Sequence, residues 1–137
     1  MKRLCLLLTL AAVGLTAPGA AAEEVEKLYS IETKAGAAVG PGAAGEASIQ
    51  IKTKGEAYIH AEAPFKVALS AKNLKLDKDK LDRGDAIQQP DGPLLKIPFT
   101  AGAAGSAELS AEMTFFICTK TLCERQKKTV SIPIEVK

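Results

Sequence analysis

The run "SAELSAEMTFFIC" (residues 106–118) alternates between apolar and polar side chains over most of its length. Such a period of two predicts a β-strand with one buried face and one outward face. The buried face is expected to carry Leu109, Ala111, Met113, Phe115 and Ile117. Continuing the alternation places Cys118 with Phe116 on the outward face, near solvent at the end of the strand. An aromatic on that polar face indicates either a docking surface or a side chain packed beneath a charged loop.

Shorter runs with the same period lie on both sides of this strand. They are residues 29–33, 46–54, 56–70 (interrupted near Pro64), 94–101 and 129–137. Their predicted core residues are Ile49, Ile51, Leu95, Ile97, Phe99, Val130, Ile132 and Ile134. Seven or eight short strands without an amphipathic helix predict an all-β protein, an immunoglobulin-like antiparallel β-sandwich. Pro133 faces outward and lacks a backbone donor, which places the last strand at or next to a sheet edge.

Two segments between these runs are expected to be irregular. The Ala/Gly-rich stretch at residues 34–45 has no useful periodicity and indicates a loop. Residues 71–93 alternate Lys with Asp and close on a Pro-Asp-Gly-Pro turn signal, which is typical of a solvated surface segment. Its aspartates lack the glycine and the alternate ligand positions of a calcium loop.

The first 22 residues have the pattern of a secretory signal peptide. Lys2 and Arg3 precede the apolar stretch 4–15, and Ala20 and Ala22 supply the small residues that signal peptidase requires. We therefore expect one periplasmic or secreted domain at residues 23–137, with no membrane insertion. Removing the two cations leaves 16 basic residues of the original 18 against 16 acidic ones, so no basic field for nucleic acid is expected.

The mature chain would keep two cysteines, Cys118 and Cys123, which are expected to form a disulfide in an oxidising compartment. The bond is either a staple between two strands or a redox centre. Four nearby cations, Lys120, Arg125, Lys127 and Lys128, favour a reactive thiolate, although they also suit a soluble hairpin tip. A loop of about six residues contributes only roughly 2 kcal/mol by loop closure, which weakens the interpretation as a staple.

The tail "FFICTKTLCERQKKTVSIPIEV" resembles the end of the N-terminal periplasmic domain of DsbD-type thiol:disulfide interchange proteins. The segment "GEAYIHAEAPFKVAL" (55–69) is similar to a stretch upstream in the same kind of domain. The resemblance implies that Cys118 and Cys123 are an exchange pair and that an aromatic side chain caps it, with Tyr58 and Phe65 as candidates. It also implies a thioredoxin-like protein or a membrane electron carrier as partner. Here four residues separate the cysteines, one fewer than the family pattern.

The alternative function is that of a non-catalytic secreted β-sandwich with a structural disulfide, acting as a binding or scaffolding domain. The single histidine, His60, is expected at a surface or rim position, and no metal-ligand spacing accompanies it. No cofactor motif is present, since no glycine-rich loop links a strand to a helix. The sequence leaves the choice between exchange and structure open.

The signal peptide makes a direct prediction about the exported protein. Its N-terminus should be Glu23, because Ala20 and Ala22 fit the cleavage pattern. Mass spectrometry of the secreted or periplasmic protein measures this, and a start before Ala17 or a lipid on Cys5 would contradict the prediction.

Overall fold

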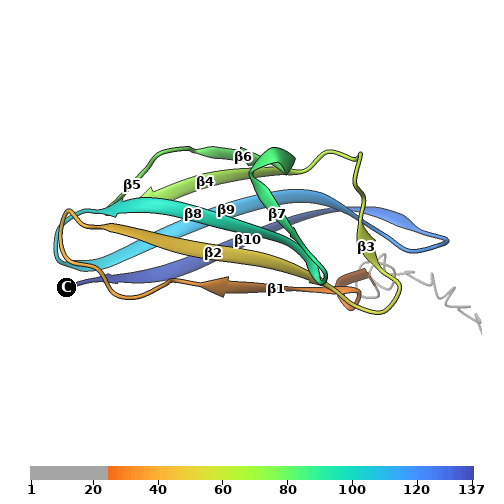
Figure 1. Cartoon of the computed structure of the whole chain (residues 1–137), viewed down its shortest axis with the longest axis horizontal. Helices are drawn as coiled ribbons and strands as arrows, with labels where there is room; N and C mark the ends of the chain where they lie inside the picture. The colour runs from red at the N-terminus through yellow and green to blue at the C-terminus, as the bar shows by residue number, and fades with distance from the viewer. Residues whose placement is uncertain (1–24) are drawn as a thin grey trace, which may run out of the picture.

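The computed structural model describes residues 25–137, which form an antiparallel β-sandwich of immunoglobulin-like type (Figure 1). The predicted signal peptide and its cleavage site lie outside these residues. No helix within the described part of the chain is long and apolar enough to cross a membrane.

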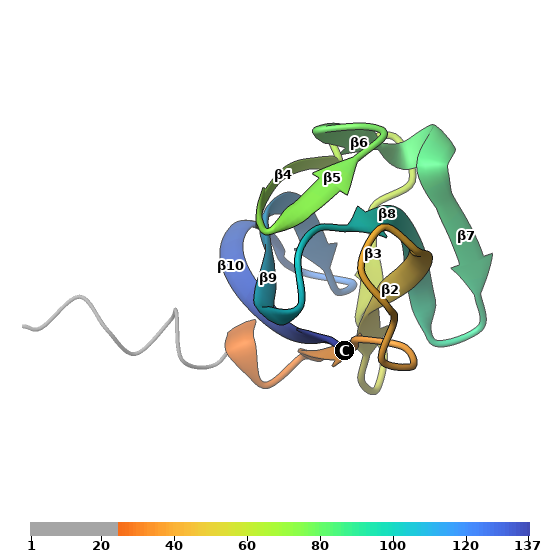
Figure 2. The ribbon, with the colours of Figure 1, turned by 90° about the vertical axis from the view of Figure 1, so that its left-hand side faces the viewer.

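Each sheet has five strands, and an end-on view shows the two sheets facing each other (Figure 2). The first sheet has the order β1-β2-β8-β5, with β7 also paired to β8. Its strands are β1 (Tyr29–Lys34), β2 (Ala44–Thr53), β5 (Leu74–Leu76), β7 (Ala86–Gln89) and β8 (Gly92–Ala101). The second sheet has the order β10-β9-β4-β6, with β3 also paired to β9. Its strands are β3 (Tyr58–Ile59), β4 (Lys66–Lys72), β6 (Lys80–Asp82), β9 (Gly105–Cys118) and β10 (Cys123–Val136).

The strand predicted from the longest alternating run is β9, which pairs with β10 along one edge and with β4 and β3 along the other. Its odd-numbered side chains from Leu109 to Ile117 are at most 1% exposed and lie at the centre of the core. All the other predicted core residues are buried as well, except Val130, which is partly buried against the core. Tyr29 completes this core, with its ring edge-on to Phe115 at 5.2 Å between centroids.

The prediction of seven or eight strands was too low, because residues 25–137 already contain ten. Three of the short strands, β5, β6 and β7, come from residues 71–93, which the sequence presented as a charged surface segment. Most of its side chains are indeed exposed, but Leu81 is 8% exposed and packs into the core. Strands of three or four residues form there because β8 and β4 offer free edges for pairing. The predicted turn before β8 is present, and Gly92 adopts a φ of 141° there.

The edge position predicted from Pro133 is confirmed. β10 is the first strand of its sheet, and Pro133 is exposed on it opposite Glu108 of β9. Most of the predicted Ala/Gly loop is irregular, but Val39 forms a parallel bridge to Val136 at the end of β10. The amide of Lys137 donates to the Val39 carbonyl at 2.8 Å. The loop thereby closes this end of the sandwich.

Two leucines that differ in burial test this core. Leu109→Ala should lower the free energy of unfolding by about 2–5 kcal/mol, since Leu109 is 0% exposed and its loss leaves a cavity. Leu122→Ala makes the same chemical change at a side chain that is 40% exposed, and it should shift stability by about 0.5 kcal/mol or less. Urea unfolding monitored by tyrosine fluorescence measures both, and equal losses would contradict the assigned core.

Candidate functional site

The two cysteines join the ends of β9 and β10 at the tip of the hairpin. Cys118 and Cys123 are directly opposite in the register, form a disulfide, and have Cα atoms 4.1 Å apart. Inside the turn, the amide of Thr119 donates to the Leu122 carbonyl at 2.7 Å. The short Cα separation is typical of a non-hydrogen-bonded antiparallel pair, in which side chains approach closely. The strand register therefore holds the two sulfurs together independently of the bond itself.

The two half-cystines differ in exposure. Cys118 is 0% exposed, whereas Cys123 is exposed. The prediction that Cys118 lies near solvent is therefore wrong, although its outward direction follows the alternation. The physical reason is that Cys118 has a neighbour on each side, Cys123 on β10 and Tyr58 on β3. Of the two half-cystines, only Cys123 is open to an approaching molecule.

Tyr58 is the aromatic that the fold brings to the disulfide. It is opposite Cys118 in the β3–β9 register, and opposite residues share one face with Cβ atoms about 4.5–5.5 Å apart. Tyr58 is also 48% exposed, so an exposed aromatic side chain is the direct strand neighbour of the buried half-cystine. Phe65 lies elsewhere, 4% exposed in the core, and Phe116 is half-buried on the outward face.

Carboxylates neutralise most of the cations near the pair. Lys120 is 3.1 Å from Glu56, Lys127 is 3.2 Å from Glu112, and Lys128 pairs with Glu26. The hydrogen bond from Lys128 to Glu26 raises the pKa of Lys128, which stays charged but committed to that partner. Among residues 25–137, no carboxylate lies within 4 Å of the Arg125 guanidinium. Arg125 is exposed two residues after Cys123, so it lies on the same face of β10 and is the cation best placed to act on that sulfur.

The loop at residues 60–65 follows β3 and is held by two side chains. The His60 imidazole Nδ1 accepts the amides of Glu62 and Ala63, each at 3.1 Å. The Arg83 guanidinium Nη2 donates to the carbonyls of His60 and Ala63 at 2.5 and 2.9 Å. The His60 amide donates to the Phe116 carbonyl of β9 at 3.1 Å, which ties the loop to the strand that ends at Cys118.

Arg83 is itself fixed by a short 3-10 helix, η1 (Arg83–Asp85), which directly follows β6. The Asp82 carboxylate accepts the Gly84 amide at 2.7 Å, and the Asp85 carboxylate accepts the Asp82 amide at 3.0 Å. These reciprocal bonds form a capping box. Lys78 adds a 2.7 Å ion pair to Asp85. Arg83 was not predicted from the sequence, where the Asp-x-x-Asp spacing of residues 82–85 could have indicated that a capped turn begins there.

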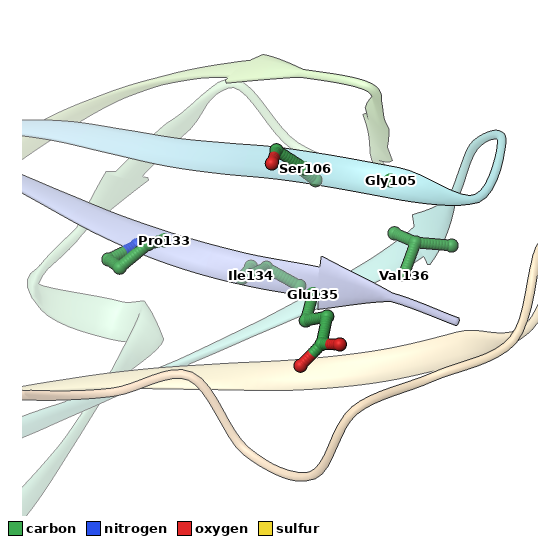
Figure 3. A pocket seen from close by; sticks show the side chains of 7 residues that line it. Gly105, Ser106, Pro133, Ile134, Glu135 and Val136 are labelled. Carbon is green, nitrogen blue, oxygen red and sulfur yellow. The ribbon is translucent and has the colours of Figure 1, made fainter.

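One hollow of the surface lies far from the disulfide. One of about 480 Å³ lies beside the far end of the β9–β10 hairpin, lined by Gly105, Ser106, Ala107 and residues 133–136. Figure 3 shows Ser106 on β9, Pro133 and Glu135 on β10, and no second ionisable side chain among those drawn. Ser106 is twelve residues from Cys118 along β9, or about 40 Å of extended strand. No group of three or more His, Cys, Asp or Glu residues in the described chain has a metal-binding arrangement.

Comparison with protein-family models and with curated proteins gives no match. Among solved structures, the chain is similar to the crystal structure of AggA, the major subunit of aggregative adherence fimbriae type I from Escherichia coli. The two share 16% sequence identity at a TM-score of 0.43, over 80% of this chain and 94% of that chain.

The cap that fixes Arg83 predicts a pH dependence. The hydrogen bond from Lys78, followed by that from the Asp82 amide, holds the pKa of the Asp85 carboxyl below its ordinary value. A lowered pKa contributes stability that is complete above the unfolded value of about 3.9 and is lost as the pH falls through the folded value. Asp85→Asn should therefore lower the urea midpoint at pH 6, and its difference from wild type should shrink below about pH 4.

Asp77→Asn is the matched control for this titration. Asp77 is exposed, and within the described residues no cation lies within 4 Å of its carboxylate. Its substitution should leave the midpoint nearly unchanged at both pH values. A difference between wild type and Asp85→Asn that stays constant from pH 6 down to pH 2 would show that the ion pair carries no pH-dependent stability.

Proposed function

We propose that this domain exchanges electrons with another protein through the Cys118–Cys123 disulfide. The observation that carries the proposal is the position of the bond, which joins opposite residues beside the turn of a hairpin, with one half-cystine exposed and the other buried. The hairpin is already held by register pairs along 14 residues of each strand. A bond that adds little to such a hairpin is better explained by chemistry than by stability.

In the proposed reaction, the thiolate of a reduced partner attacks Sγ of Cys123 and forms a mixed disulfide. The Cys123–Cys118 bond breaks, and Cys118 leaves as a thiolate that takes up a proton from solvent. The second thiol of the partner then attacks the partner's own sulfur in the mixed disulfide. The partner leaves as a disulfide, Cys123 leaves as a thiol, and two electrons and two protons have passed to this domain. The same steps in reverse oxidise it.

The difference in exposure supports Cys123 as the attacked sulfur. An incoming thiolate has to align with the S–S axis, and the buried Cys118 lies between Tyr58 and Cys123 with no open approach. The Arg125 guanidinium on the same face attracts an anionic thiolate. After reduction, the strand register keeps both thiols opposite each other, so the disulfide can form again without a rearrangement of the backbone.

The partner class and the compartment belong to the same proposal. A disulfide of this kind persists in an oxidising compartment, which agrees with export to the periplasm or beyond. The resemblance of the tail to DsbD-type domains favours a thioredoxin-like protein or a membrane electron carrier as the partner. A fold alone carries no such information, because the β-sandwich hosts many unrelated functions.

A structural disulfide in a binding domain is the second candidate, and two observations favour it. Cys118 is 0% exposed, as a staple would be. Three of the four nearby lysines and arginines are held by carboxylates, which reduces their effect on a thiolate. In that case the exposed Tyr58 and Leu122 would serve partner binding without electron transfer.

Equilibration in glutathione and dithiothreitol buffers separates the two candidates. Exchange requires a reduction potential of about −120 to −270 mV, whereas structural disulfides lie below about −300 mV. Counting free thiols by maleimide gel shift gives the potential. A bond that remains oxidised where thioredoxin-like proteins are reduced would overturn the proposal.

Two single-cysteine variants test which sulfur reacts. Cys118→Ser leaves the exposed thiol of Cys123, and it should form a mixed disulfide with an aromatic disulfide reagent about tenfold or more faster than Cys123→Ser, which leaves the buried one. The double serine variant should fold and lose about 2 kcal/mol, as expected for so short a loop. Equal reactivity of the two single variants would contradict the assignment of Cys123.

A further inference from the structure

We propose that the protein partner carries an acidic residue beside its reactive cysteine, and that Arg125 is the residue of this domain that selects it. The inference deepens the proposed exchange function, on which it rests, by naming the chemistry of the partner's surface. In the mixed disulfide, the partner's sulfur is bonded to Cys123 while the neighbouring carboxylate of the partner pairs with the Arg125 guanidinium.

The sulfur and the guanidinium lie side by side on one face of an edge strand. Cys123 and Arg125 are two residues apart on β10, the first strand of its sheet, so they point to the same face with Cα atoms about 7 Å apart. Both are exposed, whereas the residues opposite them on β9, Cys118 and Phe116, are buried and half-buried. A molecule that reaches the exposed sulfur therefore meets the guanidinium next to it.

The Arg125 guanidinium keeps its donors available for a ligand. Among residues 25–137, its side chain donates no hydrogen bond and has no carboxylate within 4 Å. Arg83, by contrast, has its guanidinium engaged with two backbone carbonyls and with the ring of Phe65. A guanidinium presents five N–H donors in a planar fork that fits both oxygens of one carboxylate. Arg125 is thus equipped to bind a carboxylate.

The surrounding charges leave this cation uncancelled at the sulfur. Lys120 and Lys127 are each paired with a carboxylate, at 3.1 and 3.2 Å. Glu124 stands between Cys123 and Arg125 in the sequence, so its side chain points to the opposite face of the strand. A negative charge beside an incoming sulfur is therefore attracted at this face, and a positive charge is repelled.

Peptide disulfides that differ in one residue test this selection. The probes are the symmetrical disulfides of acetyl-Asp-Cys-amide, acetyl-Asn-Cys-amide and acetyl-Lys-Cys-amide, used with Cys118→Ser, which keeps the thiol of Cys123. The Cys123 thiolate attacks one peptide sulfur, the peptide S–S bond breaks, and one peptide leaves as a thiolate that takes up a proton from solvent. The other peptide stays in a mixed disulfide of the kind formed with the partner. Mass spectrometry measures its rate of formation.

The charge selectivity is the rate with the Asp peptide divided by the rate with the Lys peptide. Unit charges about 7 Å apart in water change a rate by about threefold at low salt, upward for the acidic peptide and downward for the basic one. The selectivity should therefore be about ninefold higher with Arg125 than with Arg125→Gln, and the Asn peptide should lie between the other two. The substitution also alters the reactivity of the Cys123 thiol, but that factor is common to all three peptides and cancels in the ratio.

Three controls separate a carboxylate site from general effects. Arg125→Lys keeps the charge without the fork, so its selectivity should lie between those of Arg125 and Arg125→Gln. Lys75→Gln removes one positive charge from an exposed site on β5 of the other sheet and should leave the selectivity unchanged. In about 1 M salt, where the Debye length is about 3 Å, the selectivity with Arg125 should fall towards that of Arg125→Gln.

An equal charge selectivity with Arg125 and with Arg125→Gln would overturn the inference. The same comparison applies to the wild-type disulfide reduced by the three peptide thiols, which requires no cysteine variant. A reduction potential below about −300 mV would overturn the exchange function and, with it, the partner. The two failures are distinguishable, because the rates measured with the single thiol of Cys123 do not depend on that potential.

Discussion

The two-sided pairing of β9 is the constraint on which the rest of this structure depends. Its backbone bonds to β10 along one edge and to β4 and β3 along the other, so its polar groups are satisfied while its odd-numbered side chains fill the core. A slip of one residue would turn Leu109, Met113 and Phe115 to solvent, which fixes the register strongly. The same register determines which residue faces Cys118 on each side.

Alternation in the sequence predicted the part of the core that β2, β8, β9 and β10 supply, although it left out buried residues such as Tyr29 and Val67, and it failed where burial depends on segments distant in the chain. Leu109 and Ile132 are buried because they lie on the strand face that packs against the other sheet. The period of two that defines this face can be read from the local sequence alone. Cys118 has the direction that the period predicts, but a strand some sixty residues earlier covers it. The alternation could not indicate the role of Arg83. Its hydrogen-bond acceptors are backbone carbonyls, which every residue has, so no residue type in the sequence marks them. The strands β5 to β7 depend on edges offered by β8 and β4.

The electrostatics of the disulfide end differ from what a count of charges suggests. Lys120, Lys127 and Lys128 are close in sequence to the cysteines, yet each has a carboxylate from another part of the chain. Exposed pairs of this kind add little stability, and their main effect here is to cancel the local field. Any activation of the Cys123 thiol would then come chiefly from Arg125, whereas burial disfavours the thiolate of Cys118.

The bridge between Val39 and Val136 has a consequence for how the molecule behaves among its own copies. An open edge strand is a template onto which another chain can add, and β10 is a long edge. Pro133 lacks a backbone donor, and Glu135 and Lys137 are already bonded to Val39, so the final third of the edge offers no continuous ladder. The earlier part carries the exposed Arg125, which has no carboxylate within 4 Å among residues 25–137, and a charged side chain on an edge strand disfavours pairing with another edge. These features disfavour the pairing of this edge with the edge of another copy.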